Sequence, residues 1–163
     1  MQSQGSKPEV LLLLAVCSRY SQALKRARDA AERDWGPAVL ASSEFAFTET
    51  DYYRPTMGPD LLKQFLVFQE LVDPATLPDR KLITGRWETD YAIVGGHPEP
   101  RPLNLDPGYL TLGKLVLAST KDHSHRLYLG QGIYGEVTLY YRHGAWQPRE
   151  WTYPDYRRGD YQQ

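Results

Sequence analysis

The residues best suited to chemistry lie in a short polar segment of the C-terminal half. Within six positions it holds two bases, one acid and two histidines, namely Lys121, Asp122, His123, His125 and Arg126. A lysine supplies a point charge, an arginine supplies a planar fork for phosphate or carboxylate, and a histidine exchanges protons near neutral pH. The segment therefore predicts contact with an anion. The structural alternative is a solvated loop whose charges pair with each other.

Two further loops carry a similar density of polar and aromatic side chains, one from Thr48 to Gly58 and one from Asn104 to Tyr109. The same mixture of amide, cation and aromatic groups in all three loops fits recognition of an anion better than three separate solvated turns. We therefore expect the three loops to converge on one concave site. The predicted anion-binding residues are Tyr53, Asn104, Lys121, His125, Arg126 and Glu136.

Within this predicted site Arg126 grips the anion, Lys121 adds charge and His125 transfers a proton. The tyrosine and the amide orient the rest of the ligand, and Glu136 balances the cations or acts as a base. The alternative arrangement needs no pocket. In it, Lys121 ends a helix and Arg126 pairs with Glu136 across a sheet.

Other interpretations of the same residues are structural or involve a metal. A metal site would join His123 or His125 to Asp122 and to a carboxylate such as Glu136 or Asp106. Nothing in the spacing favours a particular geometry, so no metal site is predicted. Asp106 is also suited to be the N-cap of a helix that follows it.

The whole composition is that of a globular protein in a reducing compartment. Apolar residues make up 41% of the 163 residues, which suits a single domain over 1–163 with loose ends at 1–8 and 157–163. The net charge of −1 argues against a dedicated nucleic-acid binder without excluding one. The lone Cys17 cannot form an internal disulfide. The apolar run from Val10 to Val16 is too short to span a bilayer, so no membrane contact is predicted and a buried strand is favoured over an export signal.

Common catalytic and cofactor motifs are absent from the sequence. It contains no phosphate loop, no dinucleotide-binding glycine pattern, no His-Glu-x-x-His helix, no paired cysteines and no Gly-x-Ser-x-Gly turn. No cofactor follows from the residues, and whether the protein is an enzyme stays open.

Periodicity and turn signals give the expected elements. Val10 to Cys17 predicts a strand, residues 20–35 a helix, and Ala38 to Phe47 a second strand, which together favour a right-handed parallel βαβ unit. Further helices are expected from Gly58-Pro59 to Val72, with Phe65 in the core, from Thr76 to Val94, and after Asp106-Pro107-Gly108 through Leu117. Strands are expected at 127–129 and 133–141, with a hairpin turn at 142–145.

These elements predict an α+β fold. It consists of a mixed sheet with one N-terminal parallel βαβ unit, an antiparallel C-terminal hairpin, and three or four packed helices.

Several blocks of the chain match, in order, a pattern that extends over most of its length. They are Thr50 to Gly58, Asn104 to Leu110, Lys114 to Leu117 with Lys121-Asp122 and His125-Arg126, Ile133 to Leu139, and Thr152 to Tyr156. In these blocks the sequence resembles an uncharacterised bacterial family, the domain of unknown function 4416. The resemblance implies a bacterial, cytoplasmic, stand-alone protein whose first apolar run is a strand. The family has no established activity, so it implies no catalytic residues and no cofactor.

Two functions fit these observations. The first is a ligand-binding domain, with or without enzymatic activity, for a small anionic or phosphorylated molecule. The alternative is a non-catalytic interaction module that binds a protein or RNA partner through a tyrosine-rich C-terminal surface. A pocket that joins the three loops favours the first, and a flat aromatic face without a pocket favours the second.

Overall fold

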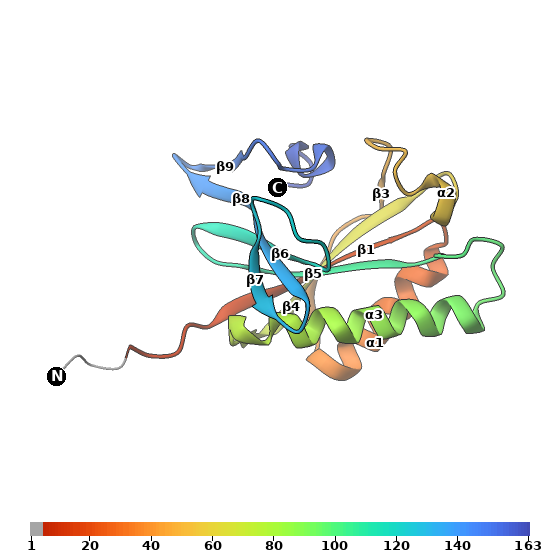
Figure 1. Cartoon of the computed structure of the whole chain (residues 1–163), viewed down its shortest axis with the longest axis horizontal. Coiled ribbons are helices and arrows are strands. Elements are labelled where there is room, and N and C mark those ends of the chain that lie inside the picture. Colours follow the sequence, from red (N-terminus) through yellow and green to blue (C-terminus); the bar gives the residue numbers. More distant parts are fainter. Residues whose placement is uncertain (1–4) are drawn as a thin grey trace.

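A nine-stranded antiparallel sheet forms the centre of the molecule, which is described by a computed structural model over residues 5–163 (Figure 1). Seven strands lie in the order β2-β4-β1-β5-β6-β8-β7, while β3 pairs with β4 and β9 pairs with β8. The strands are β1 Val10–Ser18, β2 Ala38–Ala41, β3 Phe45–Ala46, β4 Leu62–Val72, β5 Asn104–Leu110, β6 Lys114–Ser119, β7 Leu127–Gly130, β8 Ile133–Arg142 and β9 Ala145–Pro148.

Two long helices, α1 Ser21–Trp35 and α3 Leu77–Val94, cover one face of the sheet (Figure 1). Both segments are helical, as predicted. The short helix α2 Arg54–Met57 and the 3-10 turns η1 Pro74–Thr76 and η2 Pro154–Arg157 complete the chain. The predicted strands near 127–129 and 133–141 and the hairpin turn between β8 and β9 are present.

The prediction of a mixed sheet with a parallel βαβ unit is wrong. Strands β1 and β2 run in the same direction, but each pairs antiparallel with β4, which lies between them. Every strand pair in residues 5–163 is antiparallel. The chain order β1-α1-β2-β4-α3-β5 with β4 and β1 at the centre is the split βαβ arrangement. The helix between β1 and β2 makes these two strands run in the same direction. It does not decide which strand lies beside them, and here β4, a later segment of the chain, pairs with both.

The helix predicted from Gly58 to Val72 is strand β4. Leu66 and Phe68 pack under the helices, whereas Phe65 packs on the opposite face. Because both faces of this strand are buried, its sequence is apolar without alternation and resembles a helical stripe. Phe65 is in the core as predicted, at 8% exposure, although it belongs to a strand.

The helix predicted after Asp106 is the hairpin of β5 and β6, so Asp106 is not a helix N-cap. Pro107 and Gly108 were expected in the first turn of that helix, but both lie inside strand β5. A Cβ atom on Gly108 would lie 2.3 Å from the carbonyl oxygen of Val116 and 2.7 Å from Leu117 Cδ2. Gly108 therefore allows the two strands to approach more closely than any side chain permits.

The C-terminal segment covers the sheet face that the helices leave open. Tyr156 is buried there against Phe65, and the ring of Tyr161 lies 4.9 Å from Phe45 and 4.8 Å from Phe65. Residues 157–163, expected to be a loose end, thus contribute Tyr161 to this packing. Of the other expected loose end, residues 1–4 lie outside the described part of the chain, and residues 5–8 are exposed and belong to neither a helix nor a strand.

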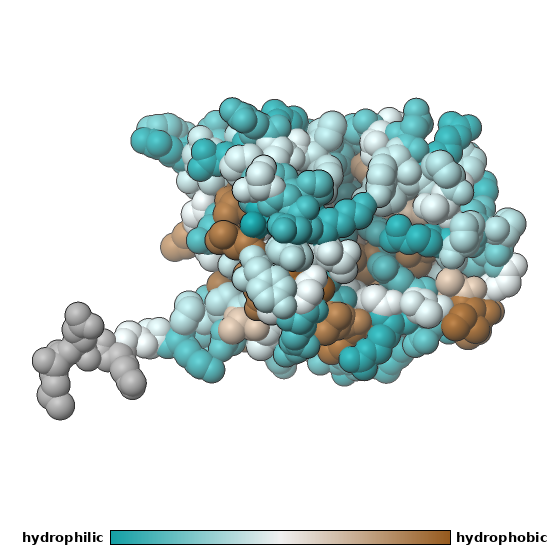
Figure 2. Space-filling view, in the orientation of Figure 1, coloured by the Kyte–Doolittle hydropathy of each residue, from teal (hydrophilic) through white to brown (hydrophobic). Residues whose placement is uncertain are grey.

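The surface shown in Figure 2 carries several separate hydrophobic patches among hydrophilic residues. Across residues 5–163, none of the helices has the length and hydropathy required to cross a bilayer.

The close approach at Gly108 can be tested by substitution. Gly108→Ala should lower the free energy of unfolding by about 1–3 kcal/mol, because the new methyl group must push apart two backbones in the middle of the sheet. Gly113→Ala is the matched control in the adjacent turn, where a Cβ atom meets nothing closer than 4.0 Å. Urea unfolding of both variants measures the difference, and equal stabilities would contradict the tight crossing.

Candidate functional site

A pocket opens where strands β5 and β6 separate. Their ladder joins only Gly108–Leu110 to Leu115–Leu117, and beyond it the strands part. The space between them, about 670 Å³, extends from helix α3 to the loops before α2 and after β6 and to η2. Its charged lining consists of Glu49, Lys63, Lys81, Glu88, Arg101, Asp106, Lys121, Arg126, Glu136 and Asp155, together with His123.

Side chains of α3 satisfy the edge of β5 that this separation leaves without a partner strand. The amide of Leu105 donates to Glu88 Oε2 at 3.0 Å, and Lys81 Nζ donates to the carbonyl oxygen of Leu105 at 3.1 Å. By the two-residue repeat of a strand, Pro107 has the same orientation, and it has no N–H that needs an acceptor. At Leu105 and Pro107 the edge can therefore line a pocket without an unsatisfied N–H group.

A buried ion pair forms one side of the pocket. Lys63 Nζ lies 2.6 Å from Asp155 Oδ2, and the two residues are 5% and 3% exposed. The ammonium group also lies 4.5 Å from the ring centre of Tyr156 and 4.8 Å from that of Phe47. Burial alone would lower the pKa of Lys63, but the charges of Asp155 and Asp106 outweigh it and raise that pKa. Lys63 is therefore charged at neutral pH, and it links β4 to η2.

A second chain of polar contacts follows β5 into the pocket. Arg101 donates to Asn104 Oδ1 at 2.9 Å, and Asn104 Nδ2 donates to Asp106 Oδ2 at 2.9 Å. Lys81 Nζ donates to the other oxygen, Asp106 Oδ1, at 3.2 Å. These contacts hold both oxygens of Asp106 in place and orient the amide of Asn104.

Two carboxylates of the pocket differ in acidity. Burial would raise the pKa of Asp106, but the charges of Lys81 and Lys63 and hydrogen bonds to its oxygens lower it overall. Burial dominates at Glu88 and raises its pKa, despite the opposing charges of Lys81 and Arg101. One group thus favours the ionised form while its neighbour is the weaker acid.

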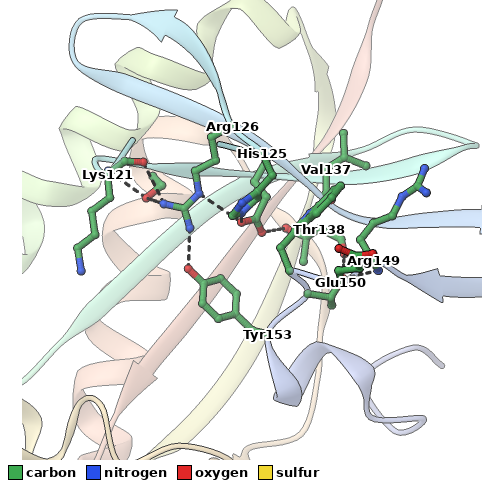
Figure 3. A network of polar contacts seen from close by, with 12 residues as sticks. Lys121, His125, Arg126, Val137, Thr138, Arg149, Glu150 and Tyr153 are labelled. Carbon is green, nitrogen blue, oxygen red and sulfur yellow. Dashed lines mark hydrogen bonds and ion pairs between the residues drawn. The ribbon is translucent and has the colours of Figure 1, made fainter. Parts of the chain in front are cut away.

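The guanidinium of Arg126 is almost fully used in bonds within the protein (Figure 3). It donates to Glu136 Oε1 at 3.2 Å, to Ser119 Oγ and the carbonyl oxygen of Lys121 at 2.9 Å each, and to the hydroxyl of Tyr153 at 2.8 Å. Four of its five N–H groups are occupied, so a bidentate grip on an anion would break existing bonds. Arg126 thus pairs with Glu136, as in the structural alternative to anion binding.

Glu136 organises this network from within the sheet. At 2% exposure it accepts a hydrogen bond from Thr138 Oγ1 at 2.9 Å, and His125 Nε2 lies 2.7 Å from its Oε1 atom. The ring of His125 stacks on Trp151, with 5.0 Å between ring centres, and does not line the pocket. His125 therefore contacts Glu136 without itself lining the pocket.

Lys121 stands at the mouth of the pocket with its charge uncompensated. Its ammonium group contacts the hydroxyl of Tyr52, which is 62% exposed. Lys63, Lys81, Arg101 and Arg126 each form an ion pair with a carboxylate. Among residues 5–163, Lys121 is the only one of the five lysines and arginines of the pocket without such a partner.

The three predicted segments line one pocket, but the prediction of a loop from Asn104 to Tyr109 is wrong, because these residues belong to strand β5. Five of the six predicted residues belong to its lining, namely Tyr53, Asn104, Lys121, Arg126 and Glu136, and His125 does not. No group of three or more His, Cys, Asp or Glu side chains in residues 5–163 is arranged to hold a metal ion.

Sequence reasoning missed much of the charged lining, above all Lys63, Lys81, Glu88 and Asp155. Lys63 carried a usable signal, since it is a single cation inside the apolar run from Leu61 to Phe68. The residues of α3 carried none, because charged side chains on a helix are ordinarily assigned to solvent.

The role of Arg126 gives a test of this geometry. Arg126→Ala leaves the buried carboxylate of Glu136 without its cation and should lower the free energy of unfolding by about 3–5 kcal/mol. The exposed Arg142→Ala serves as control and should change stability by about 0.5 kcal/mol or less. Urea unfolding reports both values. An Arg126→Ala variant as stable as the control would instead mark Arg126 as a residue held for a ligand.

Comparison with protein-family models matches residues 8–163 to the family described as Domain of unknown function (DUF4416). Searches of curated proteins and of solved structures each find no match. The matched range includes every strand and helix that surrounds the pocket. The chain therefore belongs to the DUF4416 family.

Proposed function

We propose that the protein binds a small anionic molecule, such as a phosphate ester, with its anionic group at Lys121. The observation that carries this proposal is the uncompensated charge of Lys121 at the mouth of a deep pocket. An ammonium group that forms no ion pair with a carboxylate of residues 5–163 attracts an anion.

The surroundings of Lys121 support the same proposal. Arg101 and His123 line the same pocket, and Arg101 keeps N–H groups beyond the one that it donates to Asn104. A volume of about 670 Å³ is within the range of small-molecule sites. In this arrangement Arg126 is a positioning residue, because its bonds to Ser119 and to the carbonyl oxygen of Lys121 hold the loop that carries Lys121.

Whether the bound molecule is also transformed is a separate question. Burial raises the pKa of Cys17 to about 12, so its thiol stays protonated at neutral pH and is a poor nucleophile. The unequal acidities of Glu88 and Asp106 suit proton transfer. We therefore propose binding as the function. If the bound molecule is also transformed, Glu88 and Asp106 are the residues suited to transfer protons.

The interaction-module alternative has less support. It relies on an exposed tyrosine-rich C-terminal surface, and Tyr128 and Tyr141 are exposed. Tyr153, however, lines the pocket, Tyr156 packs in the core, and Tyr161 packs on Phe45 and Phe65. The lone, buried Cys17 also supports a further proposal, that the protein works in the reducing cytoplasm of a bacterium.

The proposal predicts a charge-dependent loss of binding in Lys121→Met, which removes the ammonium group but keeps an unbranched side chain. Phosphate esters and carboxylates at millimolar concentration should raise the melting temperature of the wild-type protein. In Lys121→Met the affinity for the best of these anions should fall at least about tenfold, a loss of roughly 1.4 kcal/mol. Isothermal titration calorimetry measures this difference.

Lys25→Met is the matched control, because Lys25 is an exposed lysine on α1, away from the pocket. It should bind like the wild type. Tyr52→Phe separates the charge of Lys121 from its contact with the tyrosine hydroxyl, and it should retain most of the affinity. The proposal fails if no anion in the panel stabilises the wild type, or if Lys121→Met binds as tightly as Lys25→Met.

A further inference from the structure

The other lysine and arginine side chains of the pocket differ from Lys121 because each forms an acid–base couple with a carboxylate. Lys63 lies 2.6 Å from Asp155, and Lys81 lies 3.2 Å from Asp106. The third couple, Arg101 with Glu88, has a separation of 3.9 Å. Each couple combines one positive and one negative charge. The interior therefore presents many hydrogen-bonding groups with little net charge.

Within residues 5–163, several hydrogen-bonding positions of these couples have no partner. Glu88 Oε2 accepts from the amide of Leu105, whereas the contact of Oε1 with Arg101 at 3.9 Å is too long for a hydrogen bond. Lys81 Nζ uses two of its three N–H groups, one on Leu105 and one on Asp106. A free carboxylate oxygen thus lies in the same pocket as a free ammonium N–H group.

A hydroxyl group matches such couples better than a charged group does. It donates to the carboxylate and accepts from the ammonium, so it satisfies both members at once. A ligand ammonium would meet Lys81 and Lys63, and a ligand phosphate would meet Glu88 and Asp106. Either charge would be repelled by one member of each couple and would lose its hydration shell on entry.

Aromatic side chains provide apolar walls beside these couples. Phe47 and Tyr53 line the pocket, and their ring centres lie 5.9 Å apart. Tyr153 adds a third ring, held in place by Arg126. Ring faces of this kind pack against the C–H surface of a compact ligand, while its hydroxyl groups point toward the charged couples.

We infer that the ligand is a hydroxyl-rich small molecule that carries one anionic group, as in a sugar phosphate or polyol phosphate. The anionic group lies at Lys121 at the mouth, and the hydroxyl groups lie among the couples of Glu88, Lys81 and Asp106. This inference rests on the proposed anion-binding function and specifies the other end of the ligand.

The experiment compares three phosphate esters by isothermal titration calorimetry with the full-length protein. A hexose phosphate carries hydroxyl groups, hexyl phosphate carries none, and phosphoethanolamine carries an ammonium group in their place. The wild-type protein should bind the hexose phosphate at least about tenfold more tightly than either of the other two. All three should bind more weakly to Lys121→Met.

Glu88→Gln then tests the inner part of the pocket. Glutamine keeps an acceptor for the amide of Leu105, while the free carboxylate oxygen is lost. The affinity for the hexose phosphate should fall, whereas that for hexyl phosphate should stay unchanged. Glu70→Gln, at an exposed position of β4 outside the pocket, should change neither. Asp106→Asn provides a second inner variant should Glu88→Gln unfold, and thermal melts report whether each variant is folded.

The outcomes separate the two proposals. Equal or tighter binding of hexyl phosphate to the wild type overturns the hydroxyl inference and leaves anion binding intact. Preferred binding of phosphoethanolamine overturns it in favour of a zwitterionic ligand. An equal loss for hexose and hexyl phosphate in folded Glu88→Gln shows that Glu88 acts only on structure, which also contradicts the inference. If none of the three esters binds the wild type, the anion-binding function itself fails.

Discussion

The separation of β5 from β6 after three paired residues is the constraint on which the rest of the site depends. In a continuous ladder the backbone of β5 would bond to β6, and the space that forms the pocket would not exist. Gly108 allows the strands to meet closely at one point, and Pro107 removes an N–H group where they part. Helix α3 then supplies Glu88 and Lys81 to the free edge. A break in backbone pairing is thus compensated by side chains, which leaves a polar pocket inside a folded sheet.

The pairing of opposite charges lowers the energetic cost of burying charged side chains in this pocket. Isolated buried charges are costly, and the cations Lys63, Lys81 and Arg126, whose side chains are at most 12% exposed, therefore each lie near a carboxylate. The same pairing limits what the pocket attracts, since paired groups offer hydrogen bonds without net charge. Lys121 is the exception among the described residues, and it stands at the mouth, where water still solvates it. The two ends of the pocket therefore differ in charge. The entrance attracts anions, whereas the interior is polar and nearly neutral.

The pocket is assembled from segments that are far apart in the chain. Helix α3, strand β5, the loop after β6 and the C-terminal turn η2 each contribute side chains. Two buried ion pairs connect these parts, Lys63 with Asp155 between β4 and η2, and Arg126 with Glu136 between the loop after β6 and β8. Both pairs lie in the lining, so the contacts that stabilise the fold also shape the site. The sequence allowed two interpretations of Arg126 and Glu136, contact with a ligand or pairing with each other, and the folded chain shows the pairing.

Elements whose periodicity is local can be predicted from the amino-acid sequence. Helices α1 and α3, strand β1 and the β8–β9 hairpin follow from apolar spacing and turn residues. The shared location of three polar segments followed from their similar composition, although one of them is strand β5 and not a loop. That β4 is a strand between β1 and β2 is visible only in the folded chain, because burial on both faces removes the two-residue signal and strand neighbours depend on long-range pairing. The ion pairs depend on the same long-range pairing. Lys63 and Asp155 are 92 positions apart, and no local pattern records which charge a folded chain will place beside another.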